Sequence, residues 1–114
     1  MPRVDAGFKD RVYELVGKIP KGRLMTYGQV AALCGNAMAA WEVGQIAHFG
    51  PEDLPWQRVV NKRGGLAKAY TWGGLEGHKK QLEAEGITVN KDFTVNVEQL
   101  IWWPDEKSEL KFKL

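Results

Sequence analysis

The chain contains one cysteine and two histidines, and these are the side chains that nucleophilic or metal chemistry would most readily use. A cysteine nucleophile needs a neighbouring group that lowers the pKa of its thiol. Cys34 follows the small apolar residues 31–33 at the expected end of a helix, where a buried and inert thiol is the ordinary result. His48 and His78 are too few and too isolated to form a metal site. We therefore expect no metal, no cofactor and no internal disulfide.

Aromatic side chains offer a different chemistry, which is the stacking of a flat ligand. Trp56 is most simply interpreted as a core residue, but Pro55 before it and the polar residues 57–58 after it argue against an ordinary core strand. Residues 70–74 (Tyr-Thr-Trp-Gly-Gly) place two aromatic rings and a hydroxyl beside glycines. This composition suits a stacking pocket with a movable lip, and stacking contributes about 1–3 kcal/mol per base.

Residues 55–59 (Pro-Trp-Gln-Arg-Val) resemble the active-site segment Pro-Cys-His-Arg-Val of the O6-alkylguanine-DNA alkyltransferases. The resemblance covers roughly residues 8 to 103 and includes several further segments in the same order. These segments are residues 19–23 (Ile-Pro-Lys-Gly-Arg), 26–31 (Thr-Tyr-Gly-Gln-Val-Ala), 43–44 (Val-Gly), 60–65 (Val-Asn-Lys-Arg-Gly-Gly) and 82–87 (Leu-Glu-Ala-Glu-Gly-Ile).

The resemblance implies that the chemistry of the family is absent from this chain. Trp56 stands where the alkyl-accepting cysteine of the family stands, and Gln57 stands where its activating histidine stands. An indole and a carboxamide supply neither a thiolate nor a base. Glu85 corresponds to the glutamate that acts through that histidine, and here we expect it to be only a hydrogen-bonding residue at a helix end. The pattern resembles the alkyltransferase-like proteins, which bind the same lesions without repairing them.

The resemblance also implies how DNA would be engaged. Tyr27 matches a tyrosine that presses on the phosphate beside the target nucleotide and helps to rotate it out, although it could instead fill the space between two helices. Trp41 stands where the family usually has an arginine that fills the gap left by the flipped base. An aromatic wedge at this position and a helix–loop packing contact are equally favoured. Glu42 and Gln45 lie where the family keeps small residues, so we expect weaker or shallower binding.

These correspondences define two predicted sets of site residues. Arg58 is placed among the DNA-binding residues, although the matching arginine of the family mostly organises the loop. The spacing from Trp56 is one residue longer than in the family, so either Thr71 or Trp72 could face the base. The predicted lesion pocket comprises Trp56, the apolar walls Val59 and Val60, and Tyr70, Thr71 and Trp72. The predicted DNA-binding residues are Tyr27, Met38, Trp41, Gln45, Arg58, Lys62 and Arg63, with Lys21 and Arg23 as further phosphate contacts.

The elements that would position these residues can be read from spacing and capping signals. A helix is expected over residues 5–17 with Asp5 as its cap. Thr26 and Gln29 form a capping-box pattern that opens a helix reaching about Cys34. Asn36 is expected to cap a second helix over residues 37–49, so the two form a helix-turn-helix.

Together with the resemblance, these elements predict a helix-rich α/β domain over residues 1–103, with a winged-helix-like helix-turn-helix similar to the C-terminal domain of the alkyltransferases, and a charged tail over 104–114. Residues 50–57 read as a proline-rich loop, and residues 58–66 as a strand and turn. The last predicted elements are a helix over 74–85 and a hairpin that joins 87–89 to 93–95.

Composition limits the class of protein without naming its function. A chain of 114 residues favours one domain, which we expect to be a monomer, and no apolar run approaches the ~18 residues that a membrane span needs. The N-terminus has no apolar signal segment, so a cytoplasmic or nuclear protein is expected. A net charge of +2 permits nucleic-acid binding but does not demonstrate it.

The sequence therefore predicts a non-enzymatic protein that recognises O6-alkylguanine in duplex DNA by nucleotide flipping. The resemblance implies that the bound complex flags the lesion for nucleotide excision repair proteins. Two alternatives remain open, a helix-turn-helix protein without lesion preference and a residual alkyltransferase that uses Cys34.

Overall fold

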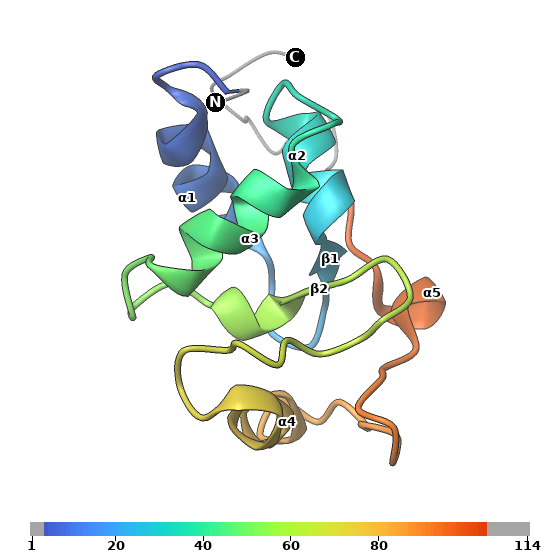
Figure 1. Cartoon of the computed structure of the whole chain (residues 1–114). Coiled ribbons are helices and arrows are strands. Elements are labelled where there is room, and N and C mark those ends of the chain that lie inside the picture. The colour runs from blue at the N-terminus through green and yellow to red at the C-terminus, as the bar shows by residue number, and fades with distance from the viewer. Residues whose placement is uncertain (1–3, 105–114) are drawn as a thin grey trace.

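The computed structural model describes residues 4–104, and in this part of the chain helices surround a small parallel sheet (Figure 1). Helices α1 (Phe8–Lys18), α2 (Tyr27–Leu33) and α3 (Ala40–His48) gather on one side of the sheet, and α4 (Gly74–Glu83) lies on the other side. The predicted helix-rich α/β architecture is confirmed. The predicted charged tail lies outside the described residues, apart from Pro104.

Strands β1 (Met25–Thr26) and β2 (Val59–Val60) are parallel, with Met25 opposite Val59. Successive side chains of a strand point to opposite faces. Val59 accordingly packs in a hydrophobic cluster with α1, α2 and α3, whereas Val60 packs in a second cluster with the α4 side of the molecule. The pairing of β1 with β2 places the start of α2 beside the segment that follows Trp56.

The predicted start of α2 is confirmed. The side chain of Thr26 accepts a hydrogen bond from the backbone N–H of Gln29 at 3.0 Å, and the side chain of Gln29 accepts one from the N–H of Thr26 at 3.1 Å. After the helix, Gly35 has a φ of 103°, a left-handed conformation that favours glycine. These two hydrogen bonds place Tyr27 in the first turn of the helix.

Two predicted helix boundaries are wrong by about three residues. The second helix of the pair begins at Ala40 because the side chain of Asn36 accepts from the N–H of Met38 and forms a turn that is not yet helical. The first helix begins at Phe8 because Asp5 uses its carboxylate in the same way on the N–H of Gly7.

The C-terminal half departs further from the prediction. The strand after the 3-10 turn η1 (Trp56–Arg58) is limited to β2, and residues 61–65 form the predicted turn. The turn predicted over residues 90–92 forms, closed by a hydrogen bond from the N–H of Asn90 to the carbonyl of Thr94 at 2.8 Å, but no ladder joins 87–89 to 93–95 among the described residues. Residues 93–95 instead pair with residues 64–66, where Leu66 donates to the carbonyl of Phe93 at 3.0 Å.

This pairing requires a close backbone approach. A Cβ on Gly64 would lie 2.2 Å from the carbonyl oxygen of Val95, so only glycine allows the two segments to meet. The short helix α5 (Val97–Leu100) follows and was not predicted. No helix within residues 4–104 is long and apolar enough to cross a membrane.

Candidate functional site

A cavity of about 630 Å³ opens between α2, α3, η1 and the loop over residues 67–72. Its volume falls in the range of about 300–1,000 Å³ that is usual for small-molecule sites. No carboxylate lines it, and its walls are mainly aromatic rings and small side chains. The predicted site residues that line it are Tyr27, Trp41, Gln45, Trp56, Tyr70, Thr71 and Trp72.

Trp56 forms a fixed wall of this cavity. Only 3% of its surface is exposed, and its indole N–H donates to the carbonyl of Pro51 at 2.8 Å. Tyr13 contacts the indole edge-on at a centroid distance of 6.0 Å. A Cβ on Gly50 would lie 2.5 Å from the indole ring, so the backbone there must be glycine. The ring is therefore a core residue that contributes a small part of its surface to the cavity wall.

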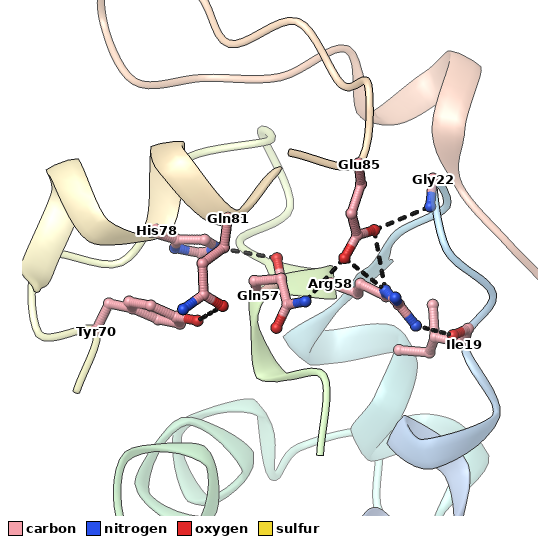
Figure 2. Close-up of polar contacts among 8 residues, drawn as sticks. All are labelled: Ile19, Gly22, Gln57, Arg58, Tyr70, His78, Gln81 and Glu85. Carbon is pink, nitrogen blue, oxygen red and sulfur yellow. Dashed lines mark hydrogen bonds and ion pairs between the residues drawn. The ribbon is translucent and has the colours of Figure 1, made fainter. Parts of the chain in front are cut away.

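Gln57 and Arg58 do not line the cavity, and their side chains converge on Glu85 (Figure 2). The carboxylate of Glu85 accepts from Nε2 of Gln57 at 2.8 Å, from Nε of Arg58 at 3.0 Å and from the backbone N–H of Gly22 at 2.9 Å. Burial alone would raise the pKa of Glu85, but these hydrogen bonds outweigh burial and hold the pKa below its usual value. Glu85 is therefore an ionised structural anchor.

Arg58 does not face the cavity, and its guanidinium is already engaged. Besides Glu85, it donates from Nη1 to the carbonyl of Ile19 at 2.7 Å, and the side chain is only 18% exposed. It joins the 3-10 turn η1 to the segment before α2. Its recorded contacts are to Glu85 and Ile19 and not to the cavity, so its predicted role in DNA binding stays a prediction.

Val59 and Val60 do not line the cavity either. Both side chains are fully buried, one in each hydrophobic cluster, because the strand that carries them is covered on both faces. The prediction that they form apolar pocket walls is corrected.

The loop over residues 67–72 supplies another wall of the cavity. The hydroxyl of Tyr70 donates to Oε1 of Gln81 at 2.7 Å, and its ring stacks on His78 at 4.5 Å. Burial raises the pKa of Tyr70 to about 12, so the phenol remains protonated. Trp72 contacts the ring of Tyr70 edge-on at 5.4 Å. Thr71 and Trp72 both line the cavity.

His78 is a structural residue whose role the sequence did not reveal. Its Nδ1 accepts from the backbone N–H of Ala67 at 3.1 Å, so its Nε2 donates to the carbonyl of Gln57 at 2.9 Å. Burial lowers the pKa of His78, although the hydrogen bond to Gln57 opposes this shift. The spacing of His78 from Leu75 and Leu82 would have placed it on the buried face of α4.

Large exposed aromatic residues lie on the outer face of α3 and directly after its last residue. Trp41 is 69% exposed and Phe49 is 77% exposed, and both line the cavity mouth. Met38 is also exposed but lies in the turn before α3, outside the cavity lining. Phe49 lies one turn after Gln45 on the same side of the helix, a spacing that could have identified it. Lys68 also lines the cavity, but it lies in an irregular loop whose sequence has no periodic pattern that could have identified it.

The predicted basic residues are not brought into the cavity. Lys62 and Arg63 are exposed in the turn after β2 and line a separate hollow of about 310 Å³ with residues 95–98. Arg23 donates to the carbonyls of Leu100 and Ile101 and so fastens the C-terminal segment. Phosphate contacts by Lys62 and Arg63 remain predictions.

The site contains no activated nucleophile among the described residues. Cys34 lies directly after α2 and is fully buried, and burial raises the pKa of its thiol to about 12. Residues 4–104 also contain no group of three or more His, Cys, Asp or Glu side chains that could hold a metal ion. The arrangement supports binding of a flat ligand by stacking and offers no group for covalent chemistry.

The family model for the DNA-binding domain of 6-O-methylguanine DNA methyltransferase matches residues 7–87. The chain belongs to this family. It is 35% identical over 103 residues to alkyltransferase-like protein 1 of Schizosaccharomyces pombe, a match that covers 85% of this chain and 95% of that protein. It is 37% identical over 97 residues to the DNA base-flipping protein of Escherichia coli, covering 83% of this chain and 74% of that protein.

Solved structures of family members have the same fold. The S. pombe alkyltransferase-like protein in complex with damaged DNA containing O6-carboxymethylguanine matches with a TM-score of 0.79 and 34% identity, covering 89% of this chain and 99% of that one. The Mycobacterium tuberculosis alkyltransferase in complex with DNA matches with a TM-score of 0.65 and 30% identity, covering 73% of this chain and 51% of that one.

Proposed function

We propose that this protein recognises O6-alkylguanine in duplex DNA by receiving the flipped nucleotide in its aromatic cavity, and that it leaves the alkyl group in place. The observation that carries the proposal is the position of Trp56. It lies on the wall of an open cavity of about 630 Å³, in the position where the family has its alkyl-accepting cysteine. The base would stack there without meeting a thiolate.

The elements around the cavity suit extrusion of a nucleotide. Tyr27 lies in the first turn of α2 at the cavity edge, and burial raises the pKa of its phenol, so it would meet a phosphate as a neutral group. Trp41 is exposed on α3 and can fill the space that the flipped base leaves. Extrusion costs a few kcal/mol, which stacking inside the cavity would offset.

A titration with matched duplexes tests the proposal. The protein should bind a duplex with one O6-methylguanine more tightly than the same duplex with guanine, and the intact protein should gain no methyl mass after incubation. Equal affinities would favour the alternative of a helix-turn-helix protein without lesion preference. A stoichiometric gain of methyl mass would instead favour the residual transferase that uses Cys34.

We further propose that the protein acts as a monomer, in a compartment that holds DNA (cytoplasm or nucleus), and passes the lesion to nucleotide excision repair proteins. The handover is supported by the lack of an activated thiol among the described residues of the site, because a bound but unrepaired lesion needs another activity to remove it. Light scattering would test the monomer. Addition of the protein to a reconstituted excision reaction should increase incision beside O6-alkylguanine, and no increase would reject the handover.

A further inference from the structure

A second, smaller hollow of about 110 Å³ lies behind the loop that walls the main cavity. The rings of Tyr70 and Trp72 line both spaces, so they form the partition between them. The lining of the smaller hollow is more polar, and its remaining members are Glu52, Leu54, Gln57 and Gln81.

The amide groups of this hollow have a defined orientation. The carboxylate of Glu85 can accept a hydrogen bond but cannot donate one, so the group of Gln57 that faces it must be Nε2. The Oε1 atom of Gln57 then has no donor among the described residues. Oε1 of Gln81 accepts from the hydroxyl of Tyr70, so Nε2 of Gln81 remains available. Figure 2 shows Gln57 between Gln81 on one side and Glu85 on the other.

The hollow therefore offers both kinds of hydrogen-bonding partner. Gln57 and the exposed carboxylate of Glu52 provide acceptors, and Gln81 provides a donor. A hydroxyl group both donates and accepts, so it could satisfy the two kinds at once. An alkyl terminus offers neither kind and would have to displace water from these groups without replacing its hydrogen bonds.

The two rings of the partition are held by different contacts. Tyr70 is held by Gln81 and by stacking on His78. Trp72 is half-buried and contacts the ring of Tyr70 edge-on at 5.4 Å, and its backbone lies close to Gly77, where a Cβ would come within 1.9 Å of the Trp72 carbonyl oxygen. A substituent that extends from a base stacked near Trp56 would pass along Trp72 to reach the polar hollow.

From this geometry we propose that the hollow is a subsite for O6 substituents that end in a hydroxyl group, so that the protein prefers O6-hydroxyalkylguanines over alkylguanines of equal length. The inference rests on the proposed function, because it requires the modified base to occupy the main cavity. The preference is a property of the chain's own residues Glu52, Gln57 and Gln81.

The test compares duplexes that carry guanine, O6-pentylguanine or O6-(4-hydroxybutyl)guanine, whose two substituents have equal numbers of heavy atoms. The hydroxybutyl duplex should bind about fivefold more tightly than the pentyl duplex, the size of one net hydrogen bond. Equal or weaker binding of the hydroxybutyl duplex, with both adducts bound better than guanine, would overturn the subsite alone. If neither adduct binds better than guanine, the proposed function fails as well.

Variants localise the effect. Glu52→Ala and Gln81→Met should each bring the ratio of the two dissociation constants close to one. Asp53→Ala and Gln99→Met are the matched controls, because both residues are exposed and lie outside the hollow. Both controls should keep the wild-type ratio. If Gln81→Met disturbs Tyr70, then Glu52→Ala, which removes no recorded hydrogen bond to either ring, still decides the outcome: an unchanged ratio in that variant would contradict the subsite.

Discussion

Trp56 and Gln57 show how a site can lose its chemistry and keep its architecture. The indole is held by a hydrogen bond to Pro51 and by the close approach of Gly50, so it forms a rigid wall. Gln57 donates to Glu85 as a neutral amide and can carry no proton to or from it. The sequence revealed both substitutions, but only the structure shows that Glu85 keeps its charge through Arg58.

Trp41 is the residue whose role can be tested with least damage to the fold. Because its side chain is 69% exposed, Trp41→Ala should change the free energy of unfolding by no more than about 0.5 kcal/mol. The loss of an aromatic wedge should weaken binding of an O6-methylguanine duplex about tenfold, within the range for base–aromatic stacking. Fluorescence anisotropy would measure the affinity, and thermal unfolding the stability.

Trp103 provides the matched control, because it is 59% exposed and lies outside the cavity lining. Trp103→Ala should leave lesion affinity unchanged. If both variants lose the same affinity, Trp41 has no special place in the complex.

Glu85 makes stability depend on pH. Its pKa is lowered in the folded protein, so its hydrogen bonds stabilise the fold at pH values above the ordinary 4.5, and this contribution is lost as the pH falls through the folded pKa. The wild-type protein should therefore lose stability between pH 7 and acid conditions, and Glu85→Gln should lose less over the same interval. Urea denaturation at pH 7 and in steps below pH 4.5 would measure the difference.

The exposed neighbour Glu83 is the control for this measurement. Glu83→Gln should retain the full wild-type acid sensitivity. A Glu85→Gln protein as sensitive to acid as the wild type would show that other groups control the transition.

At the scale of elements, hydrogen bonds join the end of α3 to the loop over residues 67–72, which forms the lip of the cavity. The hydroxyl of Thr71 donates to the carbonyl of His48 at 2.6 Å, and Nδ1 of His48 donates to the carbonyl of Ala69 at 2.9 Å. A helix placed on DNA would therefore carry the lip with it. Neither contact could be read from the sequence, because each joins residues more than twenty positions apart whose spacing has no periodic pattern.

This tie should matter for lesion preference more than for DNA binding itself. Thr71→Val keeps the shape of the side chain and removes its donor, so the affinity ratio between lesion and normal duplexes should fall about fivefold. Thr71→Ser should restore most of the ratio. Titration of both duplexes would measure it, with Thr88→Val as an exposed threonine control outside the cavity. An unchanged ratio in Thr71→Val would show that the lip does not need α3.

At the scale of the molecule, the sequence predicted the parts that depend on local chemistry. The capping box at Thr26 and the helix that ends near Gly86 follow from residues a few positions apart. The burial of Val59 and Val60 could not be predicted, because their two-residue strand is covered on both faces by distant segments. The pairing of Gly64 with Val95 in place of a local hairpin has the same cause: contact between distant segments outweighed local propensity.

The charge of the whole molecule predicts how salt should act on binding. Phosphate contacts depend on counterion release and weaken as salt rises, whereas stacking on the aromatic rings of the cavity does not. The net charge is only +2, so overall affinity should be modest and should fall with salt for any duplex. The lesion and normal duplexes share the same phosphate contacts, so plots of log affinity against log salt from about 50 to 200 mM should be parallel. A steeper slope for the lesion duplex would mean that flipping recruits additional cations, with Lys68 at the cavity wall as the first candidate.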